Sequence, residues 1–339
     1  MKTNISIILP AYNSEKYIGK SIKSILNQTF LNFELIIIVD PSSDNTIREI
    51  KKFKDKRIIL ITNKKKLGLP ACLNLGIRKS KSDLIARADS DDYYFKNRLK
   101  SQYNFLSERK DIDLVGSNAL FLEDGKFTKL ILPTSRSLIK WYMLFKCPFL
   151  HPTIMLRKKI FYKYGLYPLK KYEDYLLYSK IIDKIKFTNL EEALCVIRKH
   201  GDNISNHKNK LDNLGEIKIY KNYIKKLYKI NISNTVLSML IYMRNAPKNK
   251  KHVNLTIKKI KEIRKKFLKK NSYKKKEINA INTEVTIKII FLCIKHQAYS
   301  YLLLNAFYII KLDKFFLYYF LKKIINKFLF KKDISFVNY

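Results

Sequence analysis

Three acidic residues in this chain have the type and spacing that could hold a metal ion. Asp89, Asp91 and Asp92 stand together in the segment DSDD, directly after the apolar run DLIARA. Carboxylates spaced two apart at the end of a strand suit a partly hydrated Mg²⁺ or Mn²⁺ that is shared with the phosphates of a ligand. The alternative is an acidic turn that caps a helix, because Asp is common in such loops.

A second acidic pair, Glu173 and Asp174, opens a predicted helix in the segment KKYEDYLL. Acids in the first turn of a helix usually interact with its dipole or cap it. The functional alternative is a general base, which needs a carboxylate within reach of the proton that it removes. The pair by itself leaves both interpretations open.

Other polar and aromatic residues have similarly divided interpretations. Asp40 lies in DPSSD, where turn and N-cap roles are common. Tyr12, in PAYN, is either a core aromatic or a platform on which a base stacks. His151, in HPT, is typical of a structural histidine. His200 lies in the polar stretch RKHGDNIS beside Arg198, where we expect contact with phosphate or diphosphate.

Hydrophobic periodicity predicts the elements that position these residues. Continuous β-branched runs, expected of strands buried on both faces, occur at 6–10, 33–39, 57–62, 83–88 and 113–121. Helical windows separate them, at 15–28, 46–53, 71–79 and 99–108. This alternation predicts an α/β fold with a mainly parallel, doubly wound sheet. Because such sheets bind ligands outside the carboxyl ends of their strands, we expect PAYN, DPSSD and DSDD to converge on one crevice.

The second half of the chain changes character. We expect a helix around Trp141 and then, in order, a strand at 153–156, helices at 158–164 and 172–184, and a strand at 193–198. Beyond residue 206 apolar and Lys positions alternate at helical spacing. The sequence therefore predicts a catalytic or binding domain over 1–206 and a basic, all-helical region over 207–339.

The net charge of +41, from 69 basic and 28 acidic residues, is extreme, and residues 206–339 alone hold 31 basic and 7 acidic ones. Such a charge attracts phosphates, nucleic acid and anionic membranes. The excess is mostly Lys, whereas readers of phosphate and base edges favour Arg. Codon bias in an AT-rich genome would produce the same excess, so the charge assigns no partner by itself.

Absent motifs exclude several classes of protein. The four cysteines form no CxxC pair, so a disulfide framework or zinc site is not expected. No GxxxxGK[ST], GxGxxG, HExxH or GxSxG occurs, which argues against P-loop, dinucleotide-binding and common hydrolase sites. We find neither a signal peptide nor an apolar run long enough to span a membrane, and expect a cytoplasmic protein.

Several motifs, in order over roughly residues 4–205, resemble the family 2 glycosyltransferases, which have the glycosyltransferase A fold. The opening ILPAYNSEKYIGKSIKSILNQTFLNFELIIIVDPSSDNT and the central NKKKLGLPACLNLGI with DLIARADSDD are similar to that family. So is the segment HPTIMLRKKIF with YGLYP and YEDYLLYSKI. The resemblance implies an inverting transferase that moves a sugar from a nucleotide-diphosphate donor to a hydroxyl of a saccharide or lipid-linked saccharide. It suggests bacterial cell-surface polysaccharide synthesis, such as capsule or O-antigen.

The same resemblance implies roles for individual residues. A nucleotide-sugar site would be lined by Pro10, Ala11, Tyr12, Asn13, Asp40, Arg87, Asp89, Arg198 and His200. Asp91, with Asp89, would ligate Mg²⁺ or Mn²⁺ between the diphosphate oxygens. Asp174 would deprotonate the acceptor hydroxyl, supported by Glu173.

One departure from the family pattern concerns the second strand. The family usually has two successive acids there, and Val39 stands at the first place, so only Asp40 remains. Either the strand is shifted by one residue or the base is recognised differently. A non-catalytic sugar-nucleotide binder is therefore one alternative function. A nucleic-acid binder that uses the basic C-terminal half is another, and we do not expect it because it leaves DSDD and YED without a role.

The C-terminal region has two interpretations as well. Aromatic residues and lysines within 313–339 have the spacing of a helix that lies on an anionic membrane surface. The alternative is a helical bundle with solvated lysines. We expect a peripheral protein on the cytoplasmic face of the membrane.

Overall fold

The computed structural model describes residues 3–201, 210–242, 250–270, 272–305 and 307–309. The chain divides into two compact units. The first comprises residues 1–136 and 147–207, and the second comprises 137–146 and 208–339.

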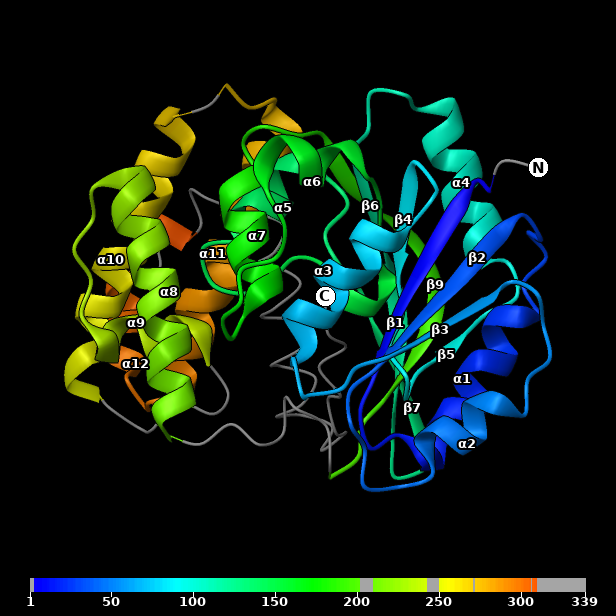
Figure 1. Ribbon diagram of the computed structural model, residues 1–339. Coiled ribbons are helices and arrows are strands. Elements are labelled where there is room, and N and C mark those ends of the chain that lie inside the picture. The colour runs from blue at the N-terminus through cyan, green and yellow to red at the C-terminus, as the bar shows by residue number, and fades with distance from the viewer. Residues whose placement is uncertain (1–2, 202–209, 243–249, 271, 306, 310–339) are drawn as a thin grey trace. The chain divides into compact units, whose positions relative to one another are not determined.

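The first unit contains one mixed β-sheet (Figure 1). Its strands are β1 (Ile5–Ala11), β2 (Phe33–Val39), β3 (Ile58–Thr62), β4 (Leu84–Arg87), β5 (Tyr93–Tyr94), β6 (Leu114–Glu123), β7 (Lys126–Leu130), β8 (Met155–Arg157) and β9 (Phe187–Arg198). Their order is β3-β2-β1-β4-β8-β6-β9-β5, and β7 pairs with β6. The strands β1 to β4 are parallel, β8 is antiparallel to both β4 and β6, and β9 is parallel to β6.

Helices cover both faces of the parallel part of the sheet. The helices of this unit are α1 (Glu15–Leu26), α2 (Thr46–Lys51), α3 (Leu69–Lys79), α4 (Arg98–Glu108), α6 (Lys159–Tyr164) and α7 (Glu173–Ile181), with a 3₁₀ turn at His151–Thr153. Alternate residues of β1 and β2 pack with the apolar face of α1, for example Ile7 and Ile37 with Ile22. The residues between them, such as Ile8 and Ile38, face Gly76 of α3.

The predicted α/β fold with a doubly wound sheet and a helical C-terminal part is confirmed. The structure adds two strands that periodicity did not indicate. β5 has only two residues, too few for a pattern to form. The strand β7, KFTKL, is almost entirely exposed and therefore lacks the continuous apolar run of a buried strand.

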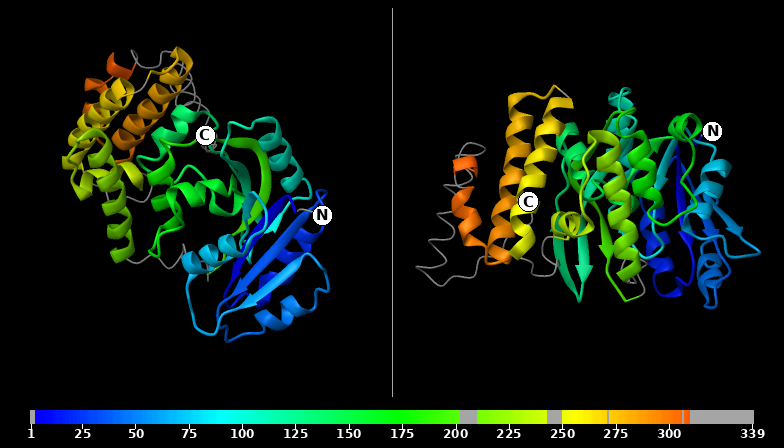
Figure 2. Two further views of the ribbon diagram at one scale, coloured as in Figure 1. Left: turned by 45° about the horizontal axis from the view of Figure 1, so that its top comes forward. Right: turned by 90° about the vertical axis from the view of Figure 1, so that its left-hand side faces the viewer.

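The second unit is a bundle of helices. They are α5 (Arg136–Tyr142), α8 (Lys210–Tyr228), α9 (Asn234–Ile241), α10 (Lys250–Lys270), α11 (Lys275–Lys295) and α12 (Tyr299–Leu304). On α10 one face is buried at Val253, Ile257, Ile260, Ile263 and Phe267, which is the spacing of a packed amphipathic helix. Figure 2 shows α10 beside α11, and the two are in contact.

Short helix α5 belongs to this bundle although it precedes α6 and α7 in the chain. Trp141 is completely buried, and its ring lies edge-on to Phe267, with 5.2 Å between ring centroids. The hydroxyl of Tyr142 donates to Glu284 Oε1 at 2.9 Å. Residues 137–146 therefore fold with the helical unit, whereas the sequence suggested a single boundary near residue 206.

The described helices of the C-terminal region pack through apolar faces, and in the described part of the chain none has an apolar stretch that could cross a bilayer. The proposed membrane-binding segment 313–339 lies outside the described residues.

Two helical glycines give a matched test of the sheet–helix packing. A Cβ on Gly76 would lie 2.5 Å from Ile8 Cγ2 and 2.9 Å from Ile38 Cδ1, whereas one on Gly19 of α1 would meet nothing within 4 Å. We expect Gly76→Ala to destabilise the protein by about 1–3 kcal/mol through overpacking. Gly19→Ala should stabilise it by up to about 1 kcal/mol through helix propensity. Urea unfolding of both variants measures this, and equal effects would contradict the packing described here.

Candidate active site

The acidic loops lie at the point where the strand order reverses. β1 and β4 are neighbours in the sheet although α1, β2, α2, β3 and α3 separate them in the chain. The loops that follow their carboxyl ends carry Tyr12 and Asp89, and Ser14 Oγ lies 2.8 Å from Ser90 Oγ. This is the place where open α/β sheets bind ligands.

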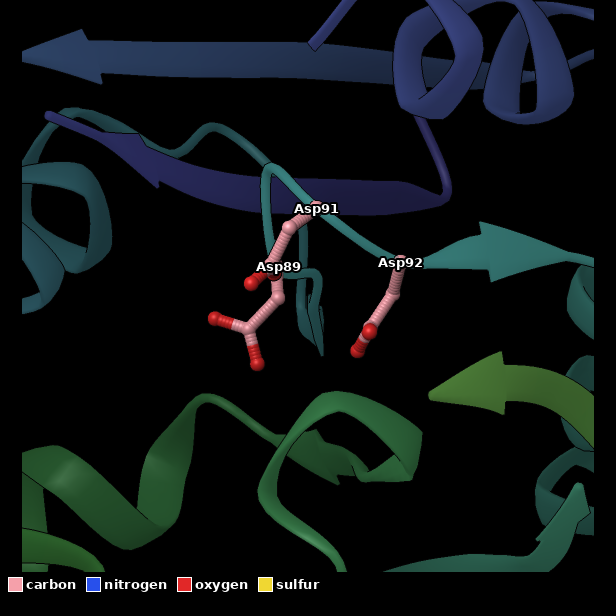
Figure 3. A group of neighbouring side chains, drawn as sticks. All are labelled: Asp89, Asp91 and Asp92. Carbon is pink, nitrogen blue, oxygen red and sulfur yellow. The ribbon is translucent and has the colours of Figure 1, made fainter. Parts of the chain in front are cut away.

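Asp89, Asp91 and Asp92 form a compact carboxylate cluster. One oxygen from each lies within 4.8 Å of the others. Figure 3 shows the three side chains directed to the same side of their loop. Burial, together with the charges of the neighbouring carboxylates, raises the pKa of Asp89 and raises that of Asp92 well above its usual value.

The chemistry of this cluster fits a divalent cation. Its donors are all carboxylate oxygens, the preferred ligands of Mg²⁺ and Mn²⁺. Among the described atoms, the buried Oδ2 of Asp92 has no hydrogen-bond partner. A bound cation would give this oxygen a partner and offset the mutual repulsion of the three carboxylates.

Arg87, the last residue of β4, is the cation at the centre of the site. Its side chain is buried and forms an ion pair with Asp89. Burial raises the pKa of both Glu173 and Asp174, and the positive charge of Arg87 acts in the opposite direction on each. Arg87 therefore interacts electrostatically with both acidic groups that the sequence singled out.

The pair Glu173 and Asp174 opens α7, as the sequence predicts. Asp174 Oδ1 accepts from the Tyr175 amide at 2.6 Å, and its Oδ2 accepts from Cys147 Sγ at 3.8 Å. Burial raises the pKa of Asp174. Burial and the adjacent Asp174 charge raise the pKa of Glu173 to about 7.

His151 contacts this pair and is therefore more than a distant core residue. Its Nδ1 lies 3.7 Å from Glu173 Oε1, and its Nε2 lies 3.1 Å from the hydroxyl of Tyr167. Burial, with the nearby charge of Arg87, lowers the pKa of His151 well below its usual value. His151 thus lies beside the Glu173 carboxyl, a neighbour that the sequence did not indicate.

Arg198 and His200, at and just after the end of β9, are brought back to the carboxylate cluster. The backbone amide of Arg198 donates to Asp92 Oδ1 at 3.0 Å, and the side-chain Nε of Arg198 donates to the Asp91 carbonyl at 3.3 Å. His200 Nε2 lies 3.0 Å from Asp91 Oδ2. Both side chains also lie against the ring of Tyr17.

The loop after β1 is held to the loop after β2. Asn13 has a positive φ of 47°. Its backbone amide donates to Ser42 Oγ at 3.1 Å, and its side-chain Oδ1 accepts from the backbone amide of Ser43 at 2.9 Å. Tyr12 is 45% exposed, and Lys66 Nζ lies 3.7 Å from the centroid of its ring. Tyr12 is therefore accessible from solvent.

Asp40 points into the protein. Its carboxylate accepts from Asn63 Nδ2 at 2.9 Å, from the Leu67 amide at 3.1 Å and from the Gly68 amide at 2.8 Å. Burial alone would raise the pKa of Asp40, but these hydrogen bonds lower it. The carboxylate therefore orders the loop between β3 and α3.

Three further residues at these strand ends are buried in the sheet. Pro10 and Ala11 pair with Ile38 and Val39 in parallel register. Val39 is only 1% exposed. Its side chain is part of the core, and Pro10 and Ala11 are buried as well.

Sequence reasoning missed several partners in this site. Asp92 was included in the DSDD metal motif, but its hydrogen bond from the Arg198 amide was not foreseen. Tyr167 and Cys147 have no recognisable local pattern. Cys147 bonds to Asp174, whereas Tyr167 bonds to His151, which in turn lies beside Glu173. Tyr94, whose hydroxyl donates to the Asp89 carbonyl at 3.2 Å, belongs to the unpredicted strand β5.

Comparison with known proteins gives a consistent match. The sequence profile described as Glycosyl transferase family 2 matches residues 6–165. An uncharacterized glycosyltransferase of Methanocaldococcus jannaschii is 33% identical over 242 residues, which is 67% of this chain and 80% of that protein. The O-antigen biosynthesis glycosyltransferase WbnJ of Escherichia coli is 35% identical and covers 58% of this chain and 80% of its own length.

A third relative is named for its substrates. It is the UDP-Glc:alpha-D-GlcNAc-diphosphoundecaprenol beta-1,3-glucosyltransferase WfgD of Escherichia coli, 30% identical over 56% of this chain and 73% of its own length. Among solved structures, Staphylococcus aureus TarS 1-349 in complex with UDP-GlcNAc aligns with a TM-score of 0.58 and 18% identity, over 85% of this chain and 84% of that one. Pyrobaculum calidifontis mannosyltransferase PcManGT with GDP-Man and Mn²⁺ aligns with a TM-score of 0.51 and 12% identity, over 88% of both chains.

The raised pKa of Glu173 predicts a specific pH dependence of stability. Its usual pKa is 4.5 and the folded value is about 7, so the folded state binds the proton more tightly. This contribution stabilises the fold below pH 4.5 and is lost as the pH rises towards 7. We therefore expect Glu173→Gln to gain up to about 3 kcal/mol of stability relative to the wild type on going from acidic to mildly alkaline pH. Urea unfolding of the wild type and the variant, at one acidic and one mildly alkaline pH, measures this gain.

Glu191→Gln, on the exposed part of β9, is the matched control and should show no such gain. A Glu173→Gln effect that is the same at both pH values would contradict the buried environment described for this carboxyl.

Proposed function

Because this chain belongs to the family 2 glycosyltransferases, we propose that it is an inverting enzyme that transfers a sugar from a nucleotide-diphosphate donor to a hydroxyl group. The observation that supports this most is that two acidic groups interact with one buried cation, Arg87. Asp89, Asp91 and Asp92 stand at the donor side, and Glu173 and Asp174 stand within the electrostatic reach of the same Arg87.

In this proposal Asp91 and Asp89 hold Mg²⁺ or Mn²⁺, with Asp92 beside them. The ion would neutralise charge on the departing nucleoside diphosphate. Arg198 and His200 keep the Asp91 loop in place, through the bonds to its carbonyl and carboxylate. Arg87 holds Asp89 in position from the buried side of the site.

Asp174 is the general base that takes the proton of the acceptor hydroxyl. Burial makes this carboxylate a stronger proton acceptor than an exposed one, because it raises its pKa. Burial and the charge of Asp174 raise the pKa of Cys147 well above its usual value, so this neighbour stays a neutral thiol that donates to Asp174. Direct displacement then needs one base and no covalent intermediate, and it inverts the configuration at the anomeric carbon.

The nucleotide binds over the loops after β1 and β2. Tyr12 offers its exposed ring to the base, and Asn13 fixes the loop through Ser42 and Ser43. Asp40 contributes indirectly, because it orders the β3–α3 loop. Val39 is buried, so base recognition does not use an acid at that place.

We further propose that the enzyme acts in cell-surface polysaccharide synthesis, on a saccharide or lipid-linked saccharide, at the cytoplasmic face of the membrane. The names of WbnJ and WfgD support this, since one refers to O-antigen biosynthesis and the other to a diphosphoundecaprenol-linked acceptor. The TarS and PcManGT structures contain UDP-GlcNAc and GDP-Man respectively, so UDP- and GDP-sugars are the first donors to test.

Replacement of the proposed base is the most direct test. We expect Asp174→Asn to reduce transfer by at least about 100-fold, the size of a general-base contribution, while donor affinity stays unchanged. The assay measures release of nucleoside diphosphate in the presence of acceptor. Asp183→Asn, an exposed position just after α7, is the matched control and should keep full activity. Wild-type turnover in Asp174→Asn would remove this assignment, and no release by the wild type with any donor would favour a non-catalytic binder.

A second test concerns the metal. We expect Mn²⁺ together with the correct nucleotide sugar to raise the melting temperature, since a ligand at about 100 times its Kd stabilises a fold by about 2.7 kcal/mol. Asp91→Asn should lose the metal-dependent part of this shift, whereas Asp183→Asn should keep it. A panel of UDP- and GDP-sugars, each with and without Mn²⁺, identifies the donor. An unchanged metal response in Asp91→Asn would contradict the assignment of this ligand.

A further inference from the structure

The first unit has a hollow of about 520 Å³ that the proposed transfer reaction does not use. It is lined by three lysines, by aromatic and aliphatic side chains and by Arg198. These residues come from α1, the β5 segment, the β6–β7 hairpin and β9. Figure 1 shows these elements, and α1 contacts β5, which pairs with β9. All of the lining residues belong to the first unit.

The rim of this hollow is positively charged. Lys20 and Lys23 lie three residues apart on α1 and are exposed, and so is Lys96. No acidic residue lines the hollow, and none of the described carboxylates forms an ion pair with these three lysines. Glu123, in the β6–β7 hairpin, pairs with Lys199 Nζ at 3.1 Å and so does not neutralise the lysines of the rim. The rim therefore attracts an anion.

The floor and outer edge of the hollow are apolar. Leu120, Leu122 and Val196 belong to the floor, and Phe127 is 61% exposed at its edge. Phe127 is flanked in the sequence by the exposed Lys126 and, two residues on, Lys129. A large aromatic side chain beside lysines is typical of surfaces that lie at the boundary between lipid headgroups and acyl chains.

We propose that this surface binds an anionic membrane lipid. The lysines hold the headgroup phosphate, and the acyl region covers the leucines and Phe127. The lining has only Ser24 and Asn27 as uncharged polar side chains apart from Tyr93, too few to read base edges, so the hydrocarbon of a lipid fits it better than a nucleic acid. This inference does not depend on the chemistry at Asp174.

The position of Arg198 gives this surface a functional consequence. Arg198 lines the hollow, and its side-chain Nε donates to the carbonyl of Asp91. Arg198 thus contacts both the proposed lipid surface and the loop of the carboxylate cluster. An enzyme bound through the hollow therefore holds its donor crevice next to the membrane, where a lipid-linked acceptor lies.

Vesicle flotation of the full-length protein tests the proposal. The vesicles are phosphatidylcholine alone, or phosphatidylcholine with phosphatidylglycerol. We expect the wild type to float with the anionic vesicles only. The variant Lys20→Ala/Lys23→Ala/Lys96→Ala should bind them on the order of 100-fold more weakly, because each lysine near an anionic surface contributes about fivefold. Phe127→Ser should weaken binding as well, although it changes no charge.

The matched control is Lys79→Ala/Lys81→Ala/Lys163→Ala, which removes three exposed lysines of the same unit that do not line the hollow. It should bind like the wild type. Equal losses in both triple variants would show a general charge effect and overturn the proposal. The proposal would also be overturned if the wild type did not bind anionic vesicles. A further contradicting result would be normal binding by Lys20→Ala/Lys23→Ala/Lys96→Ala together with loss of binding on deletion of 313–339.

Transfer to a water-soluble acceptor separates this proposal from the proposed function. The hollow triple variant should keep wild-type transfer in solution, since none of its three lysines lies in the active site. Loss of transfer by this variant would show that these lysines serve the reaction itself and would overturn the lipid assignment.

Discussion

The buried guanidinium of Arg87 is the interaction on which the site depends. Four carboxylates, those of Asp89, Asp92, Glu173 and Asp174, are largely removed from water, and burial raises the pKa of every one. The charge of Arg87 acts against that rise in all four cases. The positive charge of Arg87 therefore offsets part of the cost of burying acids from two distant parts of the chain beside one another.

Arg87 is itself held by a second buried arginine. Arg98, at the start of α4, is 1% exposed, and its Nη2 donates to the carbonyl of Arg87 at 2.7 Å. Gln102, one turn later, accepts from Arg98 Nε and donates to the carbonyl of Thr153. Side chains of α4 thus hold the end of β4, from which the DSDD loop begins. Such support is what a preorganised site requires.

The other loops of the site are also tied to one another. Ser14 links the loop after β1 to Ser90, Asn13 links it to the loop after β2, and Asp40 orders the loop that leads into α3. Each link joins segments from different strands, so the crevice is largely formed by the protein's own hydrogen bonds. A nucleotide sugar would enter a prepared site rather than organise a disordered one.

The sequence by itself determined most of the local elements and the identity of the acids, but neither the two-residue β5 nor the exposed β7. The isoleucine-rich runs of β1 and β2 and the short run of β4 indicate strands buried on both faces, because a strand with one solvated face would alternate apolar and polar residues. DSDD follows the last of these runs. Tertiary structure decided which distant residues meet these acids. His200 reaches Asp91 across 109 positions, and Trp141 joins a helical unit whose Phe267 lies far along the chain. Periodicity records only that a residue is buried, whereas its partner depends on strand order and helix packing, which no local pattern contains.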